Sequence, residues 1–251
     1  MRIPVQARVM TASVVVVIAS WQLAGQIGLI PRDFTSTPAD ILAAGVEMVR
    51  SGELWTNAQV TLLEFLAGYV LAVVVGVPLG MLMGWRQRLR QTLEPALIAL
   101  YVTPGLALLP LIVLGLGIGP ASKIAMVFVE AVITIIVNSM AGIRETDPRL
   151  VQAARSFCAT DIAVFGKVLF PSALPTIVAG LRLGAGRGVI AVIVAELYGG
   201  TVGIGLQIAT YGQSFVIAPL LFLTLVVAVF GYAVSTALGA AERRVSSWRV
   251  S

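Results

Sequence analysis

Six long stretches of this 251-residue sequence are almost free of charge, and they limit the possible folds more than any other feature. Charged residues inside them occur only at Glu130, Arg182 and Arg187. About 20 apolar residues let a helix cross the hydrocarbon core of a bilayer. Because backbone amides in lipid must be paired within the segment, we expect helices at 9–31, 65–85, 95–122, 124–143, 168–195 and 197–241.

Composition also predicts a membrane protein. Hydrophobic residues make up 58% of the chain and charged residues only 12%, whereas a soluble domain carries about 25% charged residues. Spans and short loops take up the whole length, so we expect one all-α transmembrane domain over residues 1–251. The sequence has no His and one cysteine, Cys158, which excludes an internal disulfide and the usual His/Cys metal site.

We predict six transmembrane helices. The first follows Arg2 and Arg8, and its apolar run exceeds that of a secretory signal peptide, so we interpret it as an uncleaved span. The third run contains Pro104, Pro110 and several glycines, which predicts a helix that begins late or is broken. The expected spans are about 9–30, 62–85, 96–118, 122–143, 172–197 and 216–241.

The distribution of basic residues predicts the orientation. With six crossings, only Arg32, Arg50 and Lys123 fall on one side of the membrane. Lys and Arg near span ends are retained in the cytoplasm, so we expect both termini and residues 144–171 to be cytoplasmic, in a bacterial inner membrane. The position of these basic residues near span ends accounts for the net positive charge of the chain. A nucleic-acid partner is not needed to explain it. The other side receives Arg2, Arg8, Arg86, Arg88, Arg90, Arg144, Arg149, Arg155, Lys167, Arg243, Arg244 and Arg249.

Residues 144–171 form the only long cytoplasmic loop, and its pattern is that of structured chain. Asp147 followed by Pro148 is typical of a helix start. A second short helix is expected from Thr160 or Asp161 to Pro171, which should end it. Both helices have an apolar face that lipid headgroups or another protein must cover.

The same loop carries a resemblance to a known family. Residues 151–160 read V-Q-A-A-R-S-F-C-A-T, and Phe165, Pro171 and Pro175 follow. This pattern resembles the EAA loop of binding-protein-dependent ABC importer permeases, which is EAA, three residues, Gly, and then LP. Gln152 stands in place of the usual Glu, Cys158 of Gly and Phe170 of Leu. If the position of Cys158 requires a positive φ, the backbone there is strained.

Other segments are similar to the nitrate/sulfonate/taurine branch of these permeases, among them Pro78–Gly80, Gly117–Gly119, Gly180–Arg182 and Ala195–Leu197. The resemblance implies the type I importer fold and a pathway formed with a second copy of the permease. It also implies two ABC ATPase subunits and an external solute-binding protein as partners. The residues that it assigns to ATPase coupling are Arg149, Gln152, Ala153, Ala154, Phe157, Cys158, Phe165 and Pro171.

The chain has no phosphate-binding G-x-x-x-x-G-K-[ST] motif. We therefore expect that it is not itself an enzyme and binds no cofactor directly. ATP and Mg²⁺ would bind to the partner ATPase.

Three ionisable residues are expected within spans, where charge is costly and tends to face a cavity or a partner. Arg187 should lie near the middle of the bilayer, and Glu130 and Glu196 should lie in its outer half. They either line the translocation path or gate, with Arg187 favouring an anionic solute, or form ion pairs between helices. Two stripes of small residues, Gly76 to Gly84 and Gly180 to Gly188, permit close helix packing or helix sliding at a subunit interface.

Other classes of function remain open from the residues alone. An ion-coupled secondary transporter would usually show an internal repeat, which we do not find, although Glu130 and Glu196 could carry protons. An intramembrane enzyme or a scaffold is a further alternative, for which the chain offers few catalytic groups. Within the ABC importer interpretation the expected solute is a sulfonate, nitrate or another small organic anion.

Overall fold

The computed structural model describes residues 5–28 and 35–246, and no strand occurs among them. A 3-10 turn at Gly105–Leu108 precedes α5, and a π turn at Phe165–Leu169 joins α8 to α9. The helices are α1 (Val5–Gln26), α2 (Pro38–Arg50), α3 (Glu53–Trp85), α4 (Gln87–Val102), α5 (Leu109–Leu116), α6 (Pro120–Arg144), α7 (Pro148–Ser156), α8 (Asp161–Val164), α9 (Phe170–Gly199), α10 (Ile204–Gln213) and α11 (Ile217–Ser246).

Helices α3, α6 and α9 form the core because glycines let their backbones approach closely. A Cβ added at Gly80 of α3 would lie 2.5 Å from the carbonyl oxygen of Ile136 in α6. A Cβ at Gly184 of α9 would lie 2.9 Å from the Ile135 side chain, on the same helix α6. Both glycine stripes therefore pack against α6 within one chain, as the small-residue packing rule for membrane helices predicts.

The membrane-spanning character is confirmed. Among the described residues, four helices are long and apolar enough to cross a bilayer. A shorter apolar helix covers Ala12–Gln26, and its side chains from Val14 to Ile18 are exposed. The four long ones are Glu53–Trp85, Pro120–Arg144, Asp161–Gly199 and Ile217–Arg244.

The third expected span, 96–118, is not one continuous helix. Helices α4 and α5 with its preceding turn meet at an angle of 91°, around Thr103 and Pro104. Thr103 is extended, at φ −68° and ψ 128°, because the residue before a proline is disfavoured in the helical region. The break that the prolines predicted is present, and the two halves form either a broken span or a re-entrant loop.

Other helix bounds differ from the expected spans mainly at their starts. Helix α3 begins at Glu53 rather than near 62, after Gly52 at φ +81°. Helix α9 is a few residues longer than 172–197, and α11 begins one residue later than expected. The end of the first expected span, at 29–30, lies outside the described residues, as do Arg2, Arg32 and Arg249.

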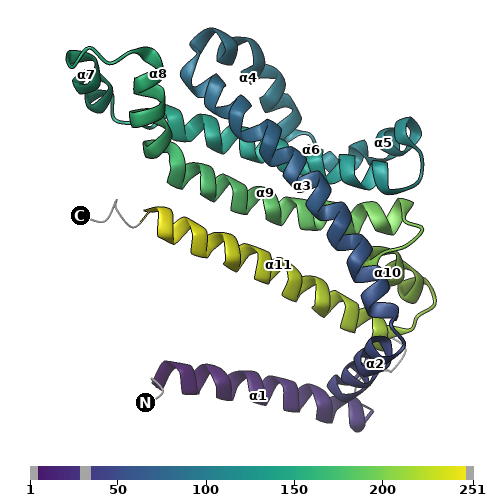
Figure 1. Ribbon diagram of the computed structural model, residues 1–251. Helices are drawn as coiled ribbons and strands as arrows, with labels where there is room; N and C mark the ends of the chain where they lie inside the picture. The colour runs from purple at the N-terminus through teal and green to yellow at the C-terminus, as the bar shows by residue number, and fades with distance from the viewer. Residues whose placement is uncertain (1–4, 29–34, 247–251) are drawn as a thin grey trace.

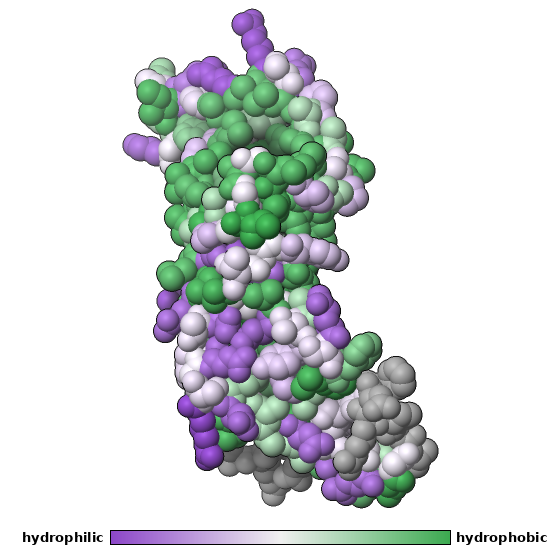
Figure 2. All heavy atoms as spheres, turned by 90° about the vertical axis from the view of Figure 1, so that its right-hand side faces the viewer, coloured by the Kyte–Doolittle hydropathy of each residue, from purple (hydrophilic) through white to green (hydrophobic). Residues whose placement is uncertain are grey.

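The elements divide between two ends of the helical bundle (Figure 1). Helices α7 and α8 lie at one end, together with the start of α1 and the last turns of α11. Helices α2, α5 and α10 lie at the opposite end. Figure 2 shows that second end, where apolar side chains predominate at the height of α5 and hydrophilic ones are more frequent toward α10 and α2.

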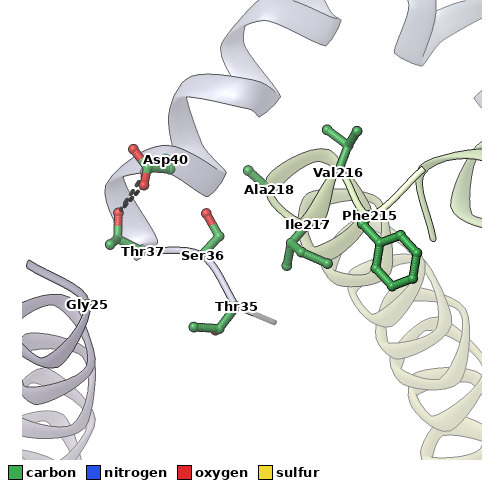
Figure 3. A pocket seen from close by; sticks show the side chains of 9 residues that line it. All are labelled: Gly25, Thr35, Ser36, Thr37, Asp40, Phe215, Val216, Ile217 and Ala218. Carbon is green, nitrogen blue, oxygen red and sulfur yellow. Dashed lines mark hydrogen bonds between the residues drawn. The ribbon is translucent and has the colours of Figure 1, made fainter. Parts of the chain in front are cut away.

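A cavity of about 370 Å³ lies at this second end, between the end of α1 and the starts of α2 and α11 (Figure 3). The Thr37 hydroxyl donates to the Asp40 carboxylate at 2.8 Å, and the Asp40 backbone N–H donates back to that hydroxyl, which caps α2. The Phe215 side chain is exposed and its backbone has φ +56°, at the turn between α10 and α11. These contacts fix the loops that close this end.

Candidate functional site

The segment 144–171 contains the two capped helix starts that the sequence predicts. The Asp147 carboxylate accepts the backbone N–H of Arg149 at 2.8 Å, and Pro148 begins α7. The Thr160 hydroxyl accepts the backbone N–H of Ala163 at 3.3 Å at the start of α8. Both caps satisfy backbone donors that the first helical turn leaves unpaired.

The expected end of the second helix at Pro171 is wrong. Helix α8 continues through the π turn at Phe165–Leu169 into α9, so that Asp161–Gly199 is one helix of 39 residues. A π turn shifts the hydrogen-bonding register by one residue, and Pro171 follows in the first turn of α9. Proline has no backbone N–H to donate, and here that donor is missing at the point where the helical hydrogen-bonding register changes.

Cys158 has φ +58°, in the left-handed region that favours glycine. Its backbone N–H donates to the carbonyl of Arg155 at 2.9 Å, and the next N–H, of Ala159, donates to Ala154 at 3.1 Å. These bonds close the end of α7 and turn the chain toward α8. The positive φ expected at the position of the family's glycine is thus present.

The coupling segment, residues 144–171, has two faces. Phe157 and Ile162, which are 88% and 80% exposed, lie on the face that does not pack against the helical bundle. Of the other residues assigned to coupling, Ala154 and Phe165 pack toward the bundle in the cluster around Ile143, and the Phe165 ring lies 4.8 Å from that of Trp85. The remaining exposed coupling residues are Arg149, Gln152, Ala153 and Cys158.

Arg187 and Glu130 are brought together in the middle of α9 and α6. The Arg187 guanidinium lies 3.7 Å from the Glu130 carboxylate, with the two side chains 45% and 14% exposed. The guanidinium also lies 5.2 Å from the centre of the Tyr101 ring, which comes from α4. A partly exposed cation in this position is held by a carboxylate and an aromatic face and retains one open side.

Glu196 is fully buried near the C-terminal end of α9, away from that pair. One of its carboxylate oxygens accepts the Thr61 hydroxyl and the other accepts the Gly205 backbone N–H, each at 2.7 Å. The Ile204 N–H donates to the same Thr61 oxygen at 3.0 Å, and the Gly203 N–H donates to Asn57 at 2.9 Å. Glu196 thereby ties the start of α10 to α3.

Glu64 and Lys123 form a buried ion pair that sequence reasoning missed. The Lys123 ammonium lies 2.7 Å from the Glu64 carboxylate, and both side chains are at most 4% exposed. Lys123 also donates to the carbonyl oxygen of Val202 at 3.1 Å. Lys123 lies in the first turn of α6, and Glu130, seven residues on, pairs with a different residue. The position of Glu64 inside the expected span 62–85 could have indicated a buried partner, because a carboxylate in a span is costly unless it is paired.

The described residues contain no group of His, Cys, Asp and Glu side chains that could hold a metal ion. What they do contain is a bundle of apolar spans, an ion pair inside it and a capped pair of short helices projecting from one end. This combination is that of a multi-pass membrane protein of the transporter class.

Comparison with known proteins identifies the family. The family described as "binding-protein-dependent transport system inner membrane component" matches residues 76–247, and the chain belongs to it. A putative aliphatic sulfonates transport permease of Bacillus subtilis is 31% identical over 236 residues, 94% of this chain and 86% of that one. A taurine transport system permease of Escherichia coli is 28% identical over 248 residues, 97% of this chain and 90% of that one.

A probable ABC transporter permease of Brucella abortus is 32% identical over 213 residues, covering 84% of this chain and 85% of that one. The inward-facing MetNI methionine ABC transporter has a similar fold, with a TM-score of 0.67 at 22% identity over 79% of this chain and 95% of that chain. The protein is therefore a membrane-spanning permease of an ABC importer with the type I fold. A secondary transporter is not favoured by this membership.

Proposed function

We propose that this permease moves a small organic anion across the membrane and is driven by two ABC ATPase subunits that bind the coupling segment. The observation that carries the proposal is the continuity of α8 with α9 through the π turn. One helix connects Ile162, exposed on the coupling segment, with Arg187 inside the bundle and Glu196 at the outer end. Movement imposed at α8 is thus transmitted to the span without an intervening hinge loop.

Alternating access follows from this connection. Closure of the ATPase subunits around ATP and Mg²⁺ draws the two coupling segments together and opens the cavity between two permease copies outward. The outer loop held by Glu196 and Thr61 separates from its neighbours in that state, and hydrolysis lets it close again. The coupling segment and both termini face the cytoplasm, and an external solute-binding protein delivers the solute to the end formed by α2, α5 and α10.

The proposed solute class rests on Arg187 and on the relatives. Two relatives are named for aliphatic sulfonates and for taurine, both of which carry a sulfonate. The guanidinium of Arg187 is only half covered and lies at a loose 3.7 Å from Glu130. A sulfonate or another oxyanion accepts two parallel N–H groups of a guanidinium, so it can compete with Glu130 for Arg187.

Substitution of exposed coupling residues tests the proposal. We expect Phe157→Ser and Ala153→Arg each to lower ATP-driven uptake by about tenfold, because a lost anchor or a new charge weakens docking. The permease should remain folded in the membrane, since neither side chain is buried. Val16→Ala, at an exposed position in the middle of α1 and outside both proposed docking ends, is the control. Unchanged uptake in both coupling variants would remove the proposed docking site.

A further inference from the structure

A cavity of about 590 Å³ lies between the coupling segment and the ends of the neighbouring helices. Its walls come from the ends of α3, α4 and α6 and from α7, α8 and the π turn. This volume is in the range of small-molecule sites, about 300–1,000 Å³. Gln152 is the one residue assigned to coupling that lines the cavity, whereas the exposed Phe157 and Ile162 do not line it.

Basic groups gather around this cavity. Arg90, Arg144 and Arg155 line it, and none of the residues that line it is acidic. Glu94 is shared by Arg90 and Arg144 at 3.5 and 3.8 Å, and Asp161 lies 3.2 Å from Arg155. Three guanidinium groups thus face two carboxylates. Glu145 and Asp147 are exposed sequence neighbours of lining residues but do not line the cavity, so the paired groups at the cavity itself carry one more positive than negative charge.

A further cation lies next to the same wall. The Arg86 guanidinium stacks 4.3 Å from the centre of the Trp85 ring, and Trp85 lines the cavity. Arg90 is the most enclosed of the arginines, with a side chain 21% exposed, whereas that of Arg144 is 48% exposed. Arginine groups with spare N–H donors bind phosphate oxygens through paired hydrogen bonds.

The remaining wall is apolar and lies where two spans end. Trp85 is the last residue of α3, Ile143 is in the last turn of α6, and Leu169 ends the π turn. Tryptophan is enriched where spans meet the headgroup region. Basic pockets between helices at the cytoplasmic surface favour anionic headgroups. The cavity is therefore lined by arginine side chains on one part of its wall and by apolar side chains on another.

We propose that this cavity binds a phosphate group, held by Arg90 and Arg144, at the base of the coupling segment. An anionic phospholipid headgroup is the source that the position at the span ends favours, since its acyl chains can lie along the apolar wall. A soluble phosphate carries the same group without the chains. Bound phosphate would neutralise the excess charge and fix α7 relative to the ends of α3 and α6.

Lipid binding to the purified full-length permease tests this site without any ATPase or transported solute, so the result is independent of the proposed transport function. The permease in neutral, phosphate-free detergent is titrated with phosphatidylglycerol or phosphatidylcholine, and retained lipid is counted by native mass spectrometry. We expect phosphatidylglycerol to bind at least about tenfold more tightly, because the choline cation of phosphatidylcholine offsets the charge of its phosphate and is repelled by the arginines, whereas phosphatidylglycerol is net anionic. Equal retention of the two lipids would exclude the lipid headgroup as the source of the phosphate group.

Matched variants assign the binding to the arginines. The double variant Arg90→Gln/Arg144→Gln should lose the preference, and the single variant Arg144→Gln, at a more exposed position, should lose part of it. Arg88→Gln is the control, because Arg88 is exposed on the same helix and does not line the cavity. Circular dichroism on heating verifies that each variant is folded. A loss in Arg88→Gln equal to that in the double variant would contradict the site.

Inorganic phosphate distinguishes the two sources. If phosphate alone raises the melting temperature of the wild type but not of the double variant, and the two lipids bind equally, the site is that of a soluble anion. If phosphatidylglycerol is retained in excess phosphate, the site belongs to the lipid headgroup. If neither phosphate nor phosphatidylglycerol distinguishes the wild type from the double variant, the cavity binds no phosphate group.

Discussion

The ammonium of Lys123 lies 2.7 Å from the carboxylate of Glu64, and both side chains are almost completely buried. The pair joins α6 to α3 near the outer end of the bundle, and Lys123 also holds the carbonyl of Val202. Together with the hydrogen bonds of Glu196 to Thr61 and Gly205, it connects α3, α6, α9 and the start of α10. Buried polar contacts thus connect these helices at the end of the bundle where α2, α5 and α10 lie.

Removal of one partner of this ion pair should be costly. We expect Lys123→Met to lower the free energy of unfolding by about 3–5 kcal/mol, because it leaves the Glu64 carboxylate buried without a counterion. Thermal unfolding of the purified permease, followed by circular dichroism, measures the effect. The double variant Lys123→Met/Glu64→Met should recover much of the loss. A single variant as stable as the wild type would show that the pair does not hold the outer end.

The glycines of the core should differ sharply from an exposed one. Gly80→Ala is expected to destabilise the permease by about 2 kcal/mol, because its Cβ would meet the Ile136 carbonyl at 2.5 Å. Gly186→Ala, on α9, has no neighbour within 4 Å and should be neutral or stabilising by up to about 1 kcal/mol. Melting temperatures of the two variants check this. Equal melting temperatures would contradict the close packing of α3 on α6.

Cys158→Gly should relieve backbone strain at the end of α7. A left-handed conformation costs a non-glycine residue about 1 kcal/mol, and glycine does not bear this cost. Amide hydrogen exchange of residues 155–160 should therefore become about fivefold slower than in Cys158→Ala, which keeps the strain. Equal exchange in the two variants would show that φ +58° is not strained in this turn.

Arg187 should matter for transport more than another arginine of the same helix. We expect Arg187→Gln to lower uptake of an anionic solute by about tenfold, since a guanidinium bonds an oxyanion through charged hydrogen bonds. Arg182→Gln is the matched control, because its side chain is equally exposed, at 45%, and pairs with Glu242. Uptake assays in vesicles containing the complete transporter compare them. Equal losses in both variants would remove Arg187 from the path.

Features that depend on a few neighbouring residues could be predicted from the sequence. The caps at Asp147 and Thr160 follow local rules, and so does the break at Pro104. The positive φ of Cys158 was predictable because the family's pattern has glycine there. Pro171 shows the limit of such rules, since the π turn before it lets the helix continue.

Features that depend on residues far apart in the chain could not be predicted in this way. Glu196 binds Thr61, 135 residues away, and Lys123 binds Glu64 on a different helix. The sequence shows that each of these residues is charged, but which residue it pairs with depends on how α3, α6 and α9 pack together. The same holds for the two faces of the coupling segment, because Phe165 packs against Trp85 and the cluster around Ile143, which come from other helices.

Uptake into sealed vesicles tests the central claim most directly. The permease is reconstituted with its ATPase and solute-binding protein, and accumulation of a radiolabelled alkanesulfonate is followed with and without ATP. We predict accumulation only when the permease, the ATPase, the binding protein and ATP are all present. Accumulation by vesicles that contain the permease alone, with no nucleotide supplied, would contradict the account.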